Sequence, residues 1–184
     1  RASRRRREPP RRRQSSSELL AAALLALIAA PAAPQEPPRL TGFLTDRAGF
    51  LSPADAAAIE DLLGRYQAGS GNEIAVLTLP SLGGRAVESA AIEVARENGI
   101  GIVGQDNGVL LLVAAEEHWI RIEVGRGLEG ELTDLLCGRI IDLVMIPEFR
   151  AGNASLGIRR GVEALIAAAG GNLAGSVKFE VFES

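Results

Sequence analysis

The chain has 184 residues, 47% of them hydrophobic, which is enough for one domain with a sizeable core and excludes intrinsic disorder for most of it. Its single cysteine, Cys137, excludes an intramolecular disulfide and a cysteine-built zinc site, and its single histidine, His118, excludes a multi-histidine metal centre. Eight arginines lie within residues 1–32, so residues 33–184, with 12 basic and 21 acidic groups, carry a net charge of −9 that disfavours nucleic-acid binding and attracts cations.

The first 32 residues have the pattern of a secretory signal peptide. Arginines precede an apolar stretch from Leu19 to Ala30, and the small-residue motif Ala30-Pro31-Ala32 follows. The apolar stretch is shorter than the ~20 residues that a membrane-spanning helix needs. An uncleaved amphipathic anchor and an organelle transit segment are the alternatives. We favour export to a periplasmic or membrane-proximal extracytoplasmic location.

The rest of the chain is predicted to contain one folded domain between two extensions. Residues 33–39 are a proline-rich spacer, because proline fits neither a helix interior nor a central strand. The folded domain covers residues 40–169, and residues 170–184 form a loose tail that opens with two glycines. Within the tail, the segment VKFEVFE is either an additional strand or a non-native remnant.

The domain begins with a well-marked helix. Ser52, Pro53 and Asp55 form a typical helix start, with Ser52 as the N-cap. Apolar residues at helical spacing follow up to Tyr66, and the turn sequence GSGN ends the helix. The later elements are predicted to be a strand at 73–79, a helix at 86–98, strands at 108–114 and 119–124, and helices at 132–144 and 155–168. The helix at 132–144 is expected to bury Leu135, Leu136, Ile140 and Val144.

This order of elements predicts the topology. A strand–helix–strand unit crosses over right-handed and makes its two strands parallel, whereas the short tip EEH makes the next pair antiparallel. The predicted fold is therefore α/β, a three-layer α/β/α sandwich with a mixed central sheet. His118 lies in the tip and is interpreted as a solvated turn residue.

Two polar loops are predicted to meet at one edge of this sheet. Asp106 and Asn107 precede the strand at 108–114, and in a hairpin the start of one strand lies beside the end of the other. These residues therefore face the acidic, glycine-rich segment GRGLEGELTD at 125–134. Oxygen ligands suit a hard cation such as Ca²⁺ or Mg²⁺ rather than a transition metal. Asp106 is therefore a candidate ligand, and Asn107 is mainly a candidate turn residue.

The same loops also have structural explanations. An Asx turn would account for the first loop. In the second, Thr133 or Asp134 could cap the following helix, Glu131 could complement its dipole, and Glu129 could be solvated.

The glycines at 125, 127 and 130 resemble a phosphate-binding GxGxxG pattern only loosely, because the lysine of a P-loop is missing. Arg126 could hold a phosphate or be exposed, and we favour exposure. Cys137 is interpreted as a small buried hydrophobe rather than a nucleophile.

Five segments closely resemble the TPM domain in order and spacing, over about residues 40–169. They read LTDRAGFLSPADAAAIEDLL, NEIAVLTLPSLGG, GIGIVGQDNGVLLLV, RIEVGRGLEGELTD and IPEFRAGNASLGIRRGVEALI. The family includes exported bacterial proteins, a thylakoid-lumen protein of photosystem II repair and an accessory subunit of animal acetylcholine receptors. The resemblance implies an α/β/α sandwich with calcium or magnesium at the acidic loops, and either an acid phosphatase or an auxiliary factor without chemistry.

The resemblance also implies a set of metal ligands, namely Asp46, Asp106, Glu129 and Asp134. Asp46 can join the others only if residues 41–51 run back across the domain. Its alternative role is that of a turn residue before the first helix.

Three classes of function remain open. The first is an exported module that binds a divalent cation and docks on, or assists assembly or repair of, a membrane-protein partner. The second is a weak metal-dependent phosphatase, in which the cation would polarise a phosphate and activate water. The third is a structural domain with an incidental ion. We place the binding module first, because no nucleophile or base is evident beyond the proposed ligands.

Overall fold

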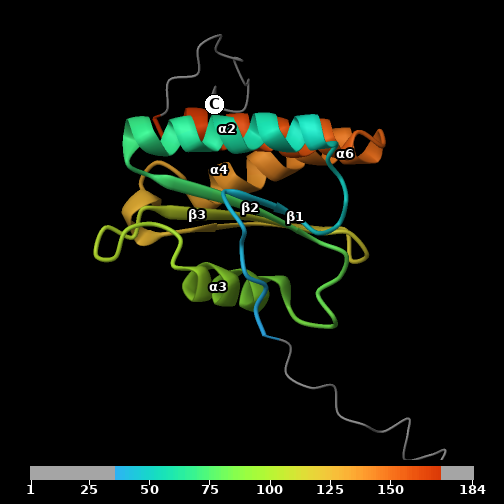
Figure 1. Ribbon diagram of the computed structural model, residues 1–184, viewed down its shortest axis with the longest axis horizontal. Coiled ribbons are helices and arrows are strands. Elements are labelled where there is room, and N and C mark those ends of the chain that lie inside the picture. The colour runs from blue at the N-terminus through green and yellow to red at the C-terminus, as the bar shows by residue number, and fades with distance from the viewer. Residues whose placement is uncertain (1–35, 171–184) are drawn as a thin grey trace, which may run out of the picture. The chain divides into compact units, whose positions relative to one another are not determined.

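A computed structural model describes residues 36–170 of the chain (Figure 1). The predicted signal peptide, the start of the predicted spacer and residues 171–184 of the tail lie outside the described residues. Helices cover both faces of one four-stranded sheet, as predicted for a three-layer α/β/α sandwich. The helices α2 (Pro53–Ser70), α4 (Asp134–Arg139) and α6 (Ala154–Ala168) lie on one face, and α3 (Val87–Asn98) lies on the other.

The sheet has the predicted mixed topology. Its order is β1-β2-β3-β4, with β1 (Leu44–Asp46), β2 (Glu73–Leu79) and β3 (Gly108–Ala114) parallel and β4 (Trp119–Val124) antiparallel to β3. The bounds of β2, β3 and β4 are those predicted from the sequence. His118 is exposed in the turn between β3 and β4, also as predicted.

The strand β1 was not predicted. It is only three residues long, too short to show a hydrophobic period, and it pairs with β2 so that Leu44 lies opposite Val76. The Glu60 carboxylate of α2 holds its entry by accepting hydrogen bonds from Phe43 N at 2.9 Å and Leu44 N at 2.6 Å. A charged side chain 16 or 17 positions away therefore fixes this strand, and local sequence carries no sign of it.

All seven residues of β3 are buried, so this strand forms the centre of the domain. Val109, Leu111 and Val113 belong to the core beneath α2 and α6, whereas Leu110 and Leu112 belong to the smaller core beneath α3. Each fully buried aliphatic side chain contributes about 1.5–3 kcal/mol relative to an exposed one. The continuous apolar run is thus explained by burial on both faces.

The first helix begins and ends as predicted. Ser52 Oγ accepts a hydrogen bond from Asp55 N, and Gly71 closes the helix in the left-handed region at φ 78°. In the same way α3 ends at Gly99, with φ 62°. Glycine is needed at both positions because a side chain is strained there.

The third predicted helix differs from the expectation. It begins at Asp134, because Thr133 is the N-cap, and it continues through the π-helical segment η2 (Ile140–Met145) into α5 (Ile146–Arg150). Pro147 has no N–H to donate, and the wider π turn accommodates that loss within a continuous helix.

The predicted apolar face of that helix is partly wrong. Ile140 and Val144 are buried and Leu136 packs against them, but Leu135 is 68% exposed. The residues that face the core are spaced four apart, which leaves Leu135 on a neighbouring, solvent-facing position. Leu132 is buried in its own right, one residue before the N-cap.

The end of the predicted spacer is bound to the domain. Pro38 is buried, and its carbonyl accepts a hydrogen bond from Asn98 Nδ2 at 3.0 Å. The Leu40 N–H donates to Asn98 Oδ1 at 2.9 Å.

No helix within residues 36–170 combines the length and apolarity that crossing a membrane requires.

Candidate functional site

Three loops meet in close backbone contact at the start of β3. A Cβ atom at Gly108 would collide with the Ile100 carbonyl, and one at Gly101 would collide with the backbone of Gly108. The loop of residues 125–128 approaches from the end of β4, and Gly125 N donates a hydrogen bond to Gly108 O at 2.8 Å. Only glycine allows backbones to come this close, so these positions are constrained by packing. We call this region the glycine junction; it comprises residues 71–73, 99–108 and 125–128.

The Asn107 side chain ties the glycine junction together. It is 6% exposed, and its Oδ1 accepts from Ile102 N at 2.8 Å. Its Nδ2 donates to Gly71 O at 2.8 Å and to Asn72 Oδ1 at 3.2 Å. The buried amide is therefore fully engaged, which a turn residue alone would not need. Sequence analysis assigned Asn107 a turn role and missed this link to the end of α2.

A glutamate adds a second link between the same loops. Glu73 N donates to Asn107 O at 3.1 Å, and Glu73 Oε2 accepts from Gly101 N at 3.0 Å. Two points of the 99–108 loop are thus fixed to the first residue of β2, which makes the region rigid.

Asp106 is held in an unusual conformation by these contacts. Its φ is 51°, in the left-handed region, which costs a non-glycine residue free energy although Asp tolerates it better than most. Its main chain is engaged, because Asp106 O accepts from Gly127 N at 3.0 Å. Its carboxylate is exposed and accepts no hydrogen bond from residues 36–170. Strain of this kind occurs where the surrounding structure imposes it, often at functional sites.

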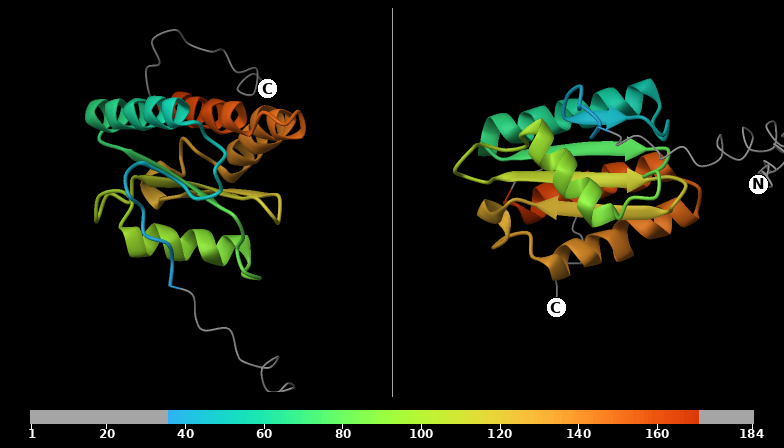
Figure 2. Two further views of the ribbon diagram at one scale, coloured as in Figure 1. Left: turned by 45° about the vertical axis from the view of Figure 1, so that its right-hand side comes forward. Right: turned by 90° about the horizontal axis from the view of Figure 1, so that it is seen from below.

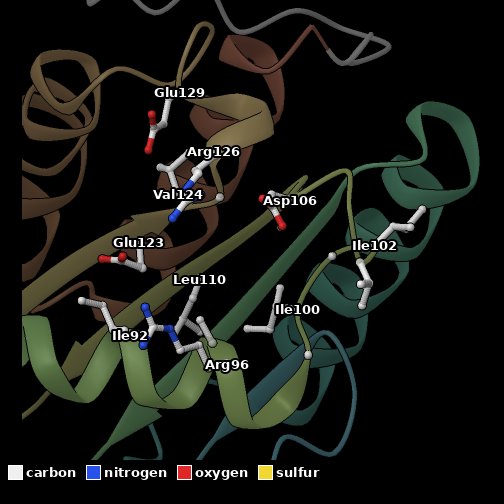
Figure 3. Close-up of a pocket in the computed structure, with 16 residues that line it drawn as sticks. Ile92, Arg96, Ile100, Ile102, Asp106, Leu110, Glu123, Val124, Arg126 and Glu129 are labelled. Atoms are coloured by element: carbon white, nitrogen blue, oxygen red, sulfur yellow. The ribbon is translucent and has the colours of Figure 1, made fainter.

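A pocket of about 640 Å³ opens beside the glycine junction, between α3 and the end of β4 (Figure 3). Its apolar lining comes from α3 and the following loop, including Ile92 and Ile100, and from Leu110 of β3. Five charged residues complete the lining: Arg96, Asp106, Glu123, Arg126 and Glu129. This combination of apolar floor and charged wall is typical of a binding site.

Two of the predicted ligands share this pocket. Asp106 and Glu129 both line it, and in Figure 3 the Arg126 side chain lies between them. Arg126 is exposed, as predicted. Glu123, by contrast, pairs with Arg121 at 3.0 Å. The prediction that loops 104–107 and 125–134 meet is confirmed for 104–107 and 125–129.

The other two predicted ligands lie elsewhere. Asp134 is exposed in the first turn of α4, where it complements the helix dipole, and it does not line the pocket. Asp46 pairs with Thr78 near the opposite end of β2 from Glu73. Five strand residues separate those ends by about 16 Å. The structure therefore does not bring Asp46 to Asp106 and Glu129.

Asp46 instead stabilises the turn before α2. Its carboxylate accepts hydrogen bonds from Gly49 N at 3.0 Å, Phe50 N at 3.2 Å and Leu51 N at 2.9 Å, and it also accepts from the Thr78 hydroxyl. The protein itself therefore uses most of the hydrogen-bond acceptor capacity of this carboxylate.

The donor set at the pocket fits a hard cation only in part. Asp106 and Glu129 offer carboxylate oxygens, the ligand type that Ca²⁺ and Mg²⁺ prefer. Nowhere in residues 36–170 do three or more His, Cys, Asp or Glu side chains gather into a group that could hold a metal. Most ligands of an ion here would have to be water or backbone carbonyls, so the residues fit a weakly held, hydrated ion and no closed cage.

The pocket lining contains no candidate nucleophile among hydroxyl, thiol, imidazole or amino side chains. Cys137 is buried, and burial, with a smaller contribution from Asp134, raises the pKa of its thiol to about 11. The thiol is therefore protonated at neutral pH, which agrees with the predicted core role. His118 lies at the far end of the hairpin, beyond the β3–β4 ladder.

Comparison with known proteins identifies relatives of this fold. A profile of the TPM domain family matches residues 44–168, and no curated protein sequence matches the chain. The solution structure of the N-terminal domain of a protein from P. gingivalis is 36% identical, with a TM-score of 0.65, over 72% of this chain and 87% of that one.

Two further solved structures share the fold. The BA42 protein from the psychrophilic bacterium Bizionia argentinensis is 24% identical, with a TM-score of 0.57, over 65% of this chain and 81% of that one. The N-terminal domain of the cg2496 protein from Corynebacterium glutamicum is 18% identical, with a TM-score of 0.56, over 80% and 90%. At these identities the likeness supports the fold alone.

The close backbone contacts of the glycine junction predict how alanine substitutions in the 125–130 loop change stability. Gly127→Ala should lower the free energy of unfolding by about 1–3 kcal/mol, because its Cβ would overlap the Gln105 carbonyl. Gly130→Ala is the matched control: no atom lies within 4 Å of its Cβ position, so its effect should stay within about 0.5 kcal/mol. Urea titration of both variants is the measurement. Equal free energies of unfolding in the two variants would contradict the close backbone contact at Gly127.

Proposed function

This chain belongs to the TPM domain family, and we propose that it is a binding module that uses the pocket beside the glycine junction to dock on a protein partner, assisted by a divalent cation. The observation that carries the proposal is the Asp106 carboxylate. It is exposed, without a partner among residues 36–170, and held on a strained backbone by a rigid junction. Such preorganisation lowers the entropic cost of binding.

Cation binding is supported by the charges at the pocket. Asp106 and Glu129 line one wall, and neither carboxylate has a hydrogen-bond or ion-pair partner within the described part of the chain. The net charge of −9 that residues 33–184 carry favours cations over long range. Ca²⁺ or Mg²⁺ would be held weakly and would keep several waters, which leaves coordination positions for oxygens of a partner.

Protein docking is supported by the apolar rim of the same pocket. Ile102 is 49% exposed and Val103 is 99% exposed, and both line the pocket mouth. Adjacent exposed aliphatic side chains beside unpaired charges are typical of an interaction surface. Ile102 is also fixed by Asn107, so the contact surface is ordered before a partner binds.

The membrane setting of the proposal rests on the sequence. The arginine-rich start, the short apolar stretch and the Ala30-Pro31-Ala32 motif support export, which would place the domain next to membrane-protein partners. Docking on such a partner, and a role in its assembly or repair, is therefore our preferred setting.

A second candidate function is a metal-dependent phosphatase acting on phosphomonoesters. The specific observation is that Arg96 and Arg126 line the same pocket as Asp106 and Glu129. Arginine binds phosphate oxygens well, and a bound divalent cation would supply a Lewis acid. The chain's own residues could bind and orient a phosphate here, but the lining provides no hydroxyl, thiol or imidazole group to act as nucleophile.

The first test of the proposed function concerns cation affinity. Asp106→Ala should weaken binding of Ca²⁺ and Mg²⁺ at least about tenfold, equivalent to ~1.4 kcal/mol, because one of two charged ligands is lost. Isothermal titration calorimetry measures this. Glu131→Ala is the control, since Glu131 is an exposed acid of the next segment that does not line the pocket.

Two further outcomes separate the alternatives. Asp46→Asn should lower stability while leaving cation affinity unchanged, because Asp46 caps the turn before α2. A wild-type protein that binds neither ion at millimolar concentration would leave a structural domain as the better description.

The second test separates binding from catalysis. We expect turnover of p-nitrophenyl phosphate and of physiological phosphoesters far below the ~10 s⁻¹ typical of enzymes, because the lining has no hydroxyl, thiol, imidazole or amino side chain and its carboxylates Asp106 and Glu129 would be engaged by the cation. Turnover near that value, abolished by Asp106→Ala and retained by Glu131→Ala, would establish the phosphatase instead.

The third test concerns export. Protein recovered from its native host should begin near residue 33, because a signal peptidase would cut after Ala30-Pro31-Ala32. Intact-mass measurement of the recovered protein reads this directly. A cytosolic protein that keeps residues 1–32 would refute export and the membrane-proximal setting.

A further inference from the structure

The pocket beside the glycine junction contains two arginines that the described fold does not use. Arg96 comes from the last turn of α3, Arg126 comes from the loop after β4, and both line the pocket. Neither side chain has a hydrogen-bond or ion-pair partner within residues 36–170. In Figure 3 the two side chains point into the pocket from different walls. Their guanidinium groups can therefore bind an anionic group of a ligand.

Apolar surface lies directly beside these arginines. Leu110 at the pocket floor is 1% exposed, and it belongs to the core beneath α3. Ala95 and Ile100 are partly buried against the same core, and they line the pocket together with Ile92. A ligand that fills this space must offer an aliphatic group and a negative charge close together.

We infer that the pocket takes the C-terminal residue of the protein partner, with its carboxylate on Arg96 and Arg126 and its aliphatic side chain on the apolar floor. The inference rests on the proposed function, because it names the part of the partner that this pocket binds. Guanidinium groups bind carboxylates through charge-assisted, often paired hydrogen bonds, which give orientation as well as affinity.

A chain terminus fits this pocket better than an internal acidic residue does. In an extended peptide, neighbouring side chains point to opposite sides. An internal Asp or Glu therefore cannot place its own carboxylate and the apolar side chain of its neighbour in one pocket. A C-terminal residue carries the carboxylate and the aliphatic side chain on the same Cα atom.

The acidic groups of the pocket favour a carboxylate over a phosphate monoester. Asp106 and Glu129 line the same pocket, and each repels an incoming anion in proportion to its charge. A carboxylate carries one negative charge, whereas a phosphate monoester carries about 1.5 to 2 at neutral pH. A divalent cation on Asp106 and Glu129 would offset this repulsion, so the cation and the terminal carboxylate should bind more tightly together than apart.

A pair of peptides tests the inference on the full chain. The probes are acetyl-Gly-Ala-Leu-Val with a free C-terminal carboxylate and the same peptide as its C-terminal amide. With EDTA present, the free acid should bind at least about tenfold more tightly than the amide, because only the acid can pair with the arginines. With Mg²⁺ present, that ratio should increase. Dissociation constants are measured by ¹H–¹⁵N NMR titration.

Substitutions of the arginines show whether they are the groups that recognise the carboxylate. Arg96→Gln and Arg126→Gln should each reduce the preference for the free acid, and the double variant should remove it. Affinity for the amide should stay unchanged, which a general disturbance of the fold would not allow. Arg65→Gln is the matched control, because Arg65 pairs with Asp61 on α2 at 3.0 Å and does not line the pocket.

Three results would overturn the inference. The first is equal affinity of the unmodified chain for the acid and the amide, and the second is a double variant that keeps the preference. The third is inorganic phosphate that binds more tightly than the free acid and depends on the same arginines, which would assign them to a phosphoester. Because the ratio is measured in EDTA, its failure is distinguishable from a failure of cation binding.

Discussion

The close backbone contact at the glycine junction is the constraint on which the rest of the site depends. Glycines at 101, 108, 125 and 127 let three loops touch, and the buried Asn107 amide fixes them to the end of α2. Because the main chain of Asp106 is held by Gly127, its backbone adopts φ 51° and its carboxylate remains exposed. The junction therefore converts ordinary loop residues into a rigid pocket wall.

The two ends of the sheet use carboxylates differently. At the carboxyl ends of β1 and β2, the Asp46 carboxylate accepts hydrogen bonds from three main-chain N–H groups. Its charge therefore stabilises the fold. At the opposite end, Asp106 and Glu129 have no such partners within residues 36–170 and line a pocket. An unpaired carboxylate at the surface costs little in water, and it gains most from an incoming cation or a basic group of a partner. Function is therefore expected at the second end.

Sequence reasoning recovered the elements whose signals are local. Strand 108–114 is a continuous apolar run, strand 73–79 contains the apolar run from Ile74 to Leu77, and Ser52 and Gly71 mark the ends of α2. It failed where contacts between residues distant in the sequence determine the local structure. The strand β1 depends on Glu60, and Asn107 acts through residues more than 30 positions away. The α3 wall of the pocket depends on how that helix packs on the sheet, which no local pattern specifies.

The placement of the site at the glycine junction is tested most directly by a Ca²⁺ titration followed residue by residue with ¹H–¹⁵N NMR on the uniformly labelled domain. We expect the amide shifts to concentrate in residues 101–107 and 125–129, with those of Asp106 and Gly127 among the largest, and the amides of residues 46–51 to stay unchanged. Shifts that centre on residues 46–51, or that spread evenly over acidic surface residues, would contradict it.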